Sequence, residues 1–484
     1  MNKRTMIGMA GTLILFFSVP VRADPITGPR ENPTRLDRWA ETLGWQLGVQ
    51  AYSFNRFTFF EAVDKTAALG LKYIEAYPGQ RIGAGTGDTA VMSFTMSPGA
   101  RAAVKKKCAD SGIRLTNFGV VTPGSTGEWR ELFEFAREMS ISTIVTEPAP
   151  EKMDLVEALC DEFKINIAIH NHPKPSRYWN PDTVLALISN RSERIGLCAD
   201  TGHWRRSGLD PLACLKKCEG RIISLHFKDL NQVEQPAHDV PWGTGVNNVW
   251  GMLTELKRQK FKGVFSIEYE YNWNNSMPEI SQCIQYFNLV SAALSPYGFR
   301  PLFKTGLSDA QFPAGGWVMT NDILSAQGKG DIWTKTRYSN FVLKVEYKTK
   351  KDSNSGVFLR TGSIQNWLHT GMEIQILDQP NDNPKHRSGA LYDVLAPVEQ
   401  MQKKTGEWNR YTIIANDNRI YVILNGEQVI NADLDQWTEA HKNPDGTPNK
   451  FNTAYKDMPR EGYIGLQYHG TPIWYKGLLV KALW

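Results

Sequence analysis

Short apolar runs alternate with helix-like stretches from Leu47 to about Leu294, and this alternation constrains the fold more than any other feature. Alternation of this kind is typical of parallel βαβ units. Eight units predict a closed (β/α)8 TIM barrel, with a doubly wound open sheet as the structural alternative. The eight candidate strands are LGVQAYSF, YIEAYPG, RLTNFGV, TIVTEPAP, INIAIHNH, IGLCAD, IISLHFKDL and VFSIEYEYN.

The helical periodicity stops after SPYGFRPLF, and a second pattern begins. Segments such as FVLKVEYKTK, GMEIQILD and RYTIIANDNRIYVILNGEQVI alternate at period two between Asn, Gly and Asp turns. This pattern predicts an all-β, jelly-roll sandwich over residues 298–484, after a barrel over residues 45–294.

The N-terminus predicts export. Lys3 and Arg4 precede an apolar stretch, and Val21-Arg22-Ala23 offers the small residues that a signal peptidase reads. We expect a signal peptide at residues 1–23 and a lead-in at 24–44, hence a periplasmic or secreted protein with no membrane contact after cleavage. A retained anchor is the alternative, although the stretch is short for a membrane span.

Charge and cysteine content exclude other classes. The net charge of +5 is small for 484 residues, and basic residues are dispersed among acids, which argues against nucleic acid as a partner. The six cysteines match no zinc knuckle, and a chain of this size needs no disulfides, so we expect mostly buried thiols. Oligomeric state is left open.

Polar residues gather at the ends of the predicted barrel strands. In IGLCAD, strand parity places Asp200 with the small residues Gly196 and Cys198, toward the barrel interior. The same reasoning brings four residues to the C-terminal rim: Glu147, Asp200, His226 and Glu268. The alternative is that each acid caps a helix or pairs with a Lys or Arg.

Three carboxylates and one imidazole at one point predict a divalent metal, because otherwise the carboxylates would repel each other. Oxygen-rich ligation favours Mn²⁺, Mg²⁺ or Co²⁺, with Zn²⁺ possible as well. Neither half shows the Gly-rich strand-turn-helix of a dinucleotide site, so we expect no NAD. PWGTGVNN follows a loop and is interpreted as a turn, not a phosphate site.

The barrel motifs TEP, CADTGH, LHFKD and SIEYE resemble the xylose-isomerase-like barrel of sugar phosphate isomerases and epimerases. The resemblance implies that Glu147, Asp200, His226 and Glu268 bind the metal. It also implies that His203 and Lys228 face the substrate, and HNH adds His172 as a substrate-binding candidate. Most members of this family are cytoplasmic and have a single domain, whereas this chain is predicted to be exported and to have two. We therefore do not expect its substrate to carry a phosphate group.

The resemblance implies enolisation of a keto-sugar, with Glu147 and Glu268 as catalytic base and acid on opposite sides of the substrate. Epimerisation, isomerisation, β-elimination and hydration share this enolate, so the outcome is left open. An endonuclease acting on abasic DNA shares the fold, but export separates this chain from DNA.

The second half resembles the 3-keto-disaccharide hydrolase family, which has a concanavalin-like sandwich, through LFKTGLSDAQF, KDSNSGVFLR, GMEIQILD and GYIGLQYHGTPIWYKGLLV. Glu373 and His469 are the candidate catalytic residues. The candidate substrate-binding residues are Arg360, Gln375, Asp378 and Gln467, and the aromatic residues that could stack on a sugar are Trp367, Tyr392 and Trp474.

Together the halves predict an enzyme that cleaves or binds a 3-keto-glycoside in the sandwich and enolises a keto-sugar in the barrel. The partner is thus a small saccharide. Two alternatives stay open: a sandwich that is a non-catalytic carbohydrate-binding module, and a glycan-binding protein whose barrel is inactive.

Overall fold

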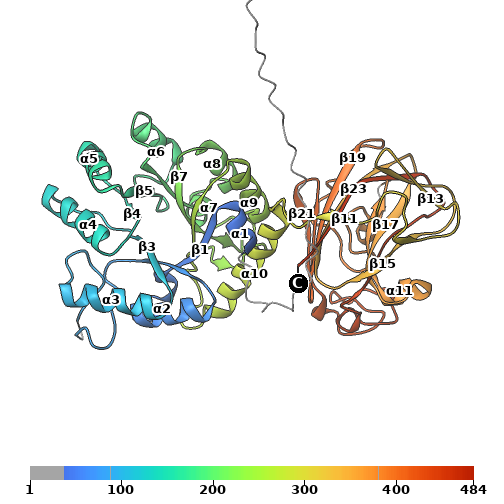
Figure 1. The fold of residues 1–484 in the computed structure, drawn as a ribbon, viewed down its shortest axis with the longest axis horizontal. Coiled ribbons are helices and arrows are strands. Elements are labelled where there is room, and N and C mark those ends of the chain that lie inside the picture. The colour runs from blue at the N-terminus through green and yellow to red at the C-terminus, as the bar shows by residue number, and fades with distance from the viewer. Residues whose placement is uncertain (1–37, 88, 380, 484) are drawn as a thin grey trace, which may run out of the picture.

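The computed structural model describes residues 38–483, apart from residues 88 and 380. The predicted signal peptide and most of the predicted lead-in lie outside the described residues. Figure 1 shows a barrel ringed by helices beside a β-sandwich, with α9 and α10 on the barrel side of the boundary. Within residues 38–483, no helix combines the length and hydrophobicity needed to cross a bilayer.

The first domain is a closed parallel barrel, as predicted, so the open-sheet alternative is wrong. Its strands follow the order β1-β10-β7-β6-β5-β4-β3-β2 around the barrel. Their bounds are β1 Trp45–Gln50, β2 Tyr73–Ala76, β3 Arg114–Phe118, β4 Thr143–Thr146, β5 Asn166–His170, β6 Ile195–Asp200, β7 Ile222–Phe227 and β10 Gly263–Ile267.

Helices surround this barrel, and their first residues explain where they begin. Ser125 and Glu128 form a capping box at α4, and proline occupies the first turn of α3, α6, α8 and α10. The helix bounds are α1 Arg38–Leu43, α2 Phe59–Ala68, α3 Pro98–Asp110, α4 Thr126–Glu138, α5 Met153–Phe163, α6 Pro181–Ile188, α7 Thr201–Arg206, α8 Pro211–Lys217, α9 Val249–Arg258 and α10 Met277–Leu294.

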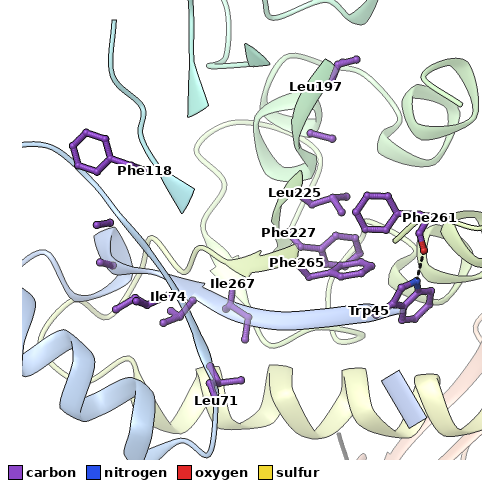
Figure 2. Close-up of a cluster of buried hydrophobic side chains, with 14 of the residues drawn as sticks. Trp45, Leu71, Ile74, Phe118, Leu197, Leu225, Phe227, Phe261, Phe265 and Ile267 are labelled. Carbon is purple, nitrogen blue, oxygen red and sulfur yellow. Dashed lines mark hydrogen bonds between the residues drawn. The ribbon is translucent and has the colours of Figure 1, made fainter. Parts of the chain in front are cut away.

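The main core lies between the barrel and its helices. Figure 2 shows Trp45, Phe227, Phe261 and Phe265 gathered on the outer side of the strands, and the Trp45 indole Nε1 donates to the Phe261 carbonyl over 3.2 Å. This contact satisfies a buried donor and fixes the start of β1 against β10.

The barrel interior is small and follows the predicted parity. Val145, Ala168 and Cys198 form a separate inner cluster, whereas Leu197 and Ala199 belong to the outer core. Asp200 therefore points inward with Cys198. All six cysteines are buried free thiols, as predicted.

The second domain is a sandwich of two antiparallel sheets, as predicted. One sheet contains β13 Trp317–Thr320, β14 Ile323–Ala326, β23 Ile473–Ala482, β16 Phe341–Thr349, β19 Trp408–Asn416, β20 Arg419–Leu424 and β21 Glu427–Asp433, with β11 Arg300–Pro301 beside β23. The other contains β12 Ala310–Gln311, β15 Ile332–Tyr338, β22 Gly462–Leu466, β17 Asn354–Thr361 and β18 Met372–Leu377.

The first sheet of the sandwich packs on the barrel. Tyr421 and Ile423 on β20 join the barrel's hydrophobic core. The Gly243 carbonyl of the barrel accepts hydrogen bonds from Gln428 Nε2 at 3.1 Å and Asn431 Nδ2 at 3.0 Å. The interface thus has an apolar centre and a polar edge, like a stable protein–protein contact.

Candidate active sites in the barrel and the sandwich

Four side chains from adjacent strands meet at the barrel mouth: His170, Asp200, His226 and Glu268. They end or follow β5, β6, β7 and β10, and all four are buried. His226 Nδ1 lies 3.2 Å from Glu268 Oε2 and 3.9 Å from Asp200 Oδ2. His170 Nε2 lies 3.5 Å from Asp200 Oδ2.

Two ring nitrogens of this group fit a metal ligand role. His170 Nε2 and His226 Nδ1 are buried and have no hydrogen-bond partner among the residues that the structure describes. Unpaired buried polar atoms are costly, and both nitrogens face carboxylate oxygens within one cluster. Two imidazole nitrogens and two carboxylate oxygens are a suitable donor set for a divalent cation.

Lys228 shares the carboxylates of this group. Its Nζ lies 2.8 Å from Asp200, 2.6 Å from Glu268 and 2.9 Å from Glu270. Burial alone would favour the neutral amine, but these carboxylates raise the pKa of Lys228 well above its ordinary value. A charged ammonium therefore lies among the acids, at the same Asp200 and Glu268 oxygens that His226 Nδ1 faces.

Glu147, a predicted ligand, is linked to the other three predicted ligands through His170. Its Oε1 is 2.5 Å from His172 Nδ1 and 3.4 Å from His170 Nδ1. Glu147, His170 and His172 form a second group of candidate ligands that shares His170 with the first. The four-residue group at the barrel mouth thus contains His170 in the place of Glu147, which the sequence predicted as the fourth ligand.

Glu75 is a buried acid that the sequence reasoning did not include. It accepts from Ser266 Oγ at 2.7 Å, and its Oε1 is 2.8 Å from His226 Nε2. This contact turns His226 Nδ1 toward Asp200 and Glu268, as the outer partner of a metal-binding histidine does. Its position at the end of the candidate strand YIEA was the available signal.

His203 lies at the same mouth, as predicted for a substrate-binding residue. Its Nε2 is 3.6 Å from Asp200 Oδ2, and its Nδ1 is 3.2 Å from the Arg206 guanidinium. Arg206 also pairs with Glu270 at 2.6 Å and Asp239 at 3.0 Å. This ionic network holds the helix α7 that carries His203 against the loop after β10.

In the sandwich, four residues form a row across the sheet face that points away from the sandwich core. β-Pairing places Trp333 opposite Gly465, Gly465 opposite Phe358, and Phe358 opposite Glu373. The Trp333 and Phe358 rings stack at 4.9 Å, and Trp367 lies 4.6 Å from Phe358. An aromatic row therefore leads to the Glu373 carboxyl, an arrangement that suits a sugar face.

Glu373 is buried and forms no salt bridge within the described part of the chain. Burial, with a contribution from the Asp331 charge, raises its pKa to about 8. A β-carbon at Gly356 would lie 2.0 Å from Glu373 Oε1, so this glycine provides the space for the carboxyl group. A carboxylic acid that keeps its proton at neutral pH can act as a general acid.

Two predicted substrate-binding residues of the sandwich have structural contacts instead. The buried Arg360 guanidinium donates to the Ser339 and Asp417 carbonyls at 2.6 Å each, and to Asn340 Oδ1 at 2.9 Å. Arg360 is therefore a structural anchor, and the prediction that it binds substrate is wrong.

The Asp378 carboxylate accepts hydrogen bonds from two neighbouring segments of the sandwich. Its Oδ1 accepts from Thr349 and Thr405 at 2.8 Å each, and its Oδ2 accepts from the Asp352 amide at 3.2 Å. These contacts occupy both oxygens and replace the predicted substrate contact. Trp474 pairs with Lys348 on the other sheet, so it does not join the row beside Glu373.

Gln375 and Gln467 lie on the Glu373 face of the sheet. Gly356 pairs with Gln375, and the Gly356 carbonyl accepts from the Gln467 amide at 2.9 Å. His469 is exposed two residues beyond Gln467. The geometry thus brings two of the four predicted substrate-binding residues, Gln375 and Gln467, to the face that carries Glu373.

Two family models match the chain. A xylose isomerase-like TIM barrel matches residues 63–287, and a 3-keto-alpha-glucoside-1,2-lyase-like domain matches residues 300–481. Both boundaries agree with the two folded domains.

The chain is similar to curated relatives of both kinds. It is 28% identical over 181 residues to a 3-keto-disaccharide hydrolase of Bacteroides thetaiotaomicron, covering 32% of this chain and 62% of that protein. It is 30% identical over 128 residues to an inosose dehydratase of Bacillus cereus, covering 23% of this chain and 43% of that protein. The chain thus spans less than two thirds of the length of either relative.

A solved structure from Parabacteroides distasonis is 34% identical, with a TM-score of 0.37, and covers 38% of this chain and 98% of that one. Residues 63–287 of the chain thus match the xylose isomerase-like TIM barrel family, and residues 300–481 match the 3-keto-alpha-glucoside-1,2-lyase-like family.

Proposed function

We propose that this protein is an exported enzyme of 3-keto-sugar metabolism with two active sites. The barrel enolises a keto-sugar with the help of a divalent metal, and the sandwich cleaves a 3-keto-glycoside. Both families support a sugar-modifying enzyme. The convergence of His170, Asp200, His226 and Glu268 at the barrel mouth carries the proposal.

His170, Asp200, His226 and Glu268 would hold the metal, with Glu147 as a further predicted ligand. A divalent cation bound there supplies Lewis acidity at a carbonyl and its neighbouring hydroxyl oxygen. Mn²⁺, Mg²⁺ and Co²⁺ suit the carboxylates, and the second imidazole also makes Zn²⁺ suitable. Lys228 adds positive charge beside the same oxygens.

Proton transfer is assigned to Glu147 and Glu268. β4 and β10 are separated by β5, β6 and β7, so these residues face each other across the mouth. Burial opposes ionisation of Glu147, but hydrogen bonds with His170 and His172 lower its pKa, which keeps it in the form that accepts a proton. His203 and Lys228 would orient the sugar oxygens.

The sandwich supplies the cleavage step in this proposal. A ketone at C3 acidifies the C2 proton and so permits loss of the C1 substituent. Glu373, protonated at neutral pH, can donate a proton to the leaving oxygen. The aromatic row of Trp333, Phe358 and Trp367 also suits a non-catalytic saccharide-binding module, which is the second candidate role.

Solvent exchange tests the barrel function. The full chain carrying Asp331→Asn, which removes the charged neighbour of Glu373 in the sandwich, is incubated with a 3-keto-glucoside in D₂O, with Mn²⁺ or with a chelator, and deuterium next to the ketone is measured by NMR. We expect exchange with Mn²⁺ and a loss of at least ~100-fold with chelator or in Asp200→Asn. Exchange that survives both changes would count against the proposal.

A pair of variants separates the two roles of the sandwich. Glu373→Gln should strongly slow cleavage of an alkyl 3-keto-glucoside such as the methyl glucoside, while saccharide binding, measured by calorimetry, is retained. Trp367→Ala should weaken binding first. If Glu373→Gln cleaves as fast as the parent protein, the sandwich is a binding module.

A further inference from the structure

Asp331 lies on the same sheet face as Glu373, although it is far from it in sequence. Ile332 pairs with Leu466, and Leu466 pairs with Val357, so the preceding residue of β15 is level with Gln467 and Gly356. A second row thus runs beside the Glu373 row, and it contains Asp331, Gln467, Gly356 and Gln375.

The Glu373 side chain reaches toward the row that contains Asp331. Asp331 precedes β15 and Glu373 lies on β18, with β22 and β17 between them. The Glu373 carboxyl group lies over Gly356, where Oε1 is 2.0 Å from the position that a β-carbon of this glycine would take. Gly356 and Asp331 share a row and are two strand spacings of about 4.8 Å apart, so the two carboxyl groups approach each other from opposite sides of β22.

The Asp331 carboxylate is anchored on one side. Its Oδ1 accepts from the Tyr468 amide at 2.8 Å. No second hydrogen-bond partner of this carboxylate occurs in the described part of the chain, and the side chain is only partly buried. One oxygen is therefore fixed while the other stays available to a bound sugar.

The electrostatics of the two carboxyl groups are linked. Burial raises the pKa of Asp331, and His469 opposes this rise. Burial and the Asp331 charge raise the pKa of Glu373 to about 8. Two neighbouring carboxyl groups resist ionising together, so one proton remains, and the deeper burial of Glu373 keeps it there.

We infer that Asp331 is the catalytic base that removes the C2 proton of a 3-keto-glycoside, while Glu373 protonates the leaving oxygen. This inference rests on the proposed cleavage function of the sandwich. It assigns the base of that elimination to a residue outside the predicted site.

The step balances within the pair. Asp331 takes the C2 proton, the C2–H electrons form the C1=C2 double bond, and the C1–O bond breaks with its electron pair on oxygen. Glu373 gives its proton to that oxygen. The products are the free alcohol and an unsaturated 3-keto-sugar, and exchange with water returns the proton from Asp331 to Glu373.

Leaving-group dependence tests the assignment. The test uses the full chain with His226→Ala, which removes the barrel ligand, and compares methyl and 4-nitrophenyl 3-keto-glucosides. Asp331→Asn should slow both by at least ~100-fold, because both need the C2 proton removed. Glu373→Gln should slow the methyl glucoside by a similar factor but the 4-nitrophenyl one less than ~10-fold, since nitrophenolate leaves without an acid.

Controls separate this inference from the proposed function. Asp322→Asn, in an exposed turn, should match the parent. Asp331→Glu moves the carboxylate and should retain partial activity, and melting temperatures show that each variant is folded. If Asp331→Asn cleaves both glucosides within threefold of the parent, the inference is wrong while the function stands. If the parent cleaves neither, the proposed function of the sandwich fails as well.

Discussion

Single residues in the sandwich set the charge state of its site. Glu373 holds its proton until about pH 8 in the folded protein, whereas an exposed glutamate loses it near pH 4.5. Between these values unfolding releases a proton, so the contribution of Glu373 to stability falls as pH rises and is lowest above pH 8.

Glu373→Gln should therefore stabilise the protein more at pH 9 than at pH 5. Each unit of pKa shift corresponds to about 1.4 kcal/mol, so the difference between the two pH values is a few kcal/mol at most. Denaturation of parent and variant at both pH values measures it. Glu399→Gln, at an exposed site, is the control, and an equal effect of both substitutions would refute a buried, protonated Glu373.

Gly356→Ala tests the space beside Glu373. The added β-carbon would lie 2.0 Å from Glu373 Oε1 and 2.7 Å from its Cδ and Cγ, so the whole side chain must swing aside, and the change should displace Glu373 without unfolding the sheet. We expect 3-keto-glycoside cleavage to fall more than ~10-fold with little change in melting temperature. Gly127→Ala, on α4 with open space around it, should change neither quantity.

The sequence predicted the site residues whose side-chain direction follows from their position within a strand. Asp200, His226 and Glu268 end adjacent strands, so their meeting followed from the barrel alone. Glu75 and Asp331 were missed, because their roles depend on partners in distant strands. Arg360 was misplaced because positive φ at this residue and a register shift in β17 turn its side chain out of the expected parity.

At the scale of elements, the buried Asp229 carboxylate fixes the barrel loop that precedes α9 and contacts the sandwich. Asp229 accepts from the amides of Gly243 and Gly245 at 2.9 Å each, and of Asn247 at 3.0 Å. The predicted turn PWGTGVNN is therefore folded around Asp229, the neighbour of Lys228. The same loop presents the Gly243 carbonyl to β21.

Asp229→Asn should weaken this loop. An amide has one accepting oxygen and places an NH₂ group against backbone donors, so unsatisfied amides cost about 1–3 kcal/mol. Urea denaturation of the full chain should show that loss, and Asp322→Asn should not. An unchanged unfolding midpoint would show that the loop is held by other contacts.

The strands of both domains were predictable because the spacing of hydrophobic residues shows which side of a strand is buried. Eight barrel strands and the alternating strands of the sandwich follow from period and turn residues. The contact of β20 and β21 with the barrel was not predictable, since Tyr421 and Ile423 alternate like any strand residues and only the packed structure shows which domain they cover.

At the scale of the whole molecule, the same kind of reaction is proposed for both sites. A proton next to a ketone is removed at each proposed site, by the carboxylates of the barrel mouth and by Asp331 in the sandwich. The product of cleavage in the sandwich would still be a keto-sugar, the class that the barrel is proposed to enolise. A firm interface explains how one chain could carry both steps.

Metal stoichiometry is the most direct test of the barrel site. The full chain is stripped with a chelator, dialysed against Mn²⁺, and its bound manganese is counted by elemental analysis and electron paramagnetic resonance. We expect about one ion per chain, lost in the double variant Asp200→Asn/His226→Ala and retained in Asp322→Asn. A folded parent protein that binds no manganese, or a double variant that binds it equally well, would contradict a metal site at these four strand ends.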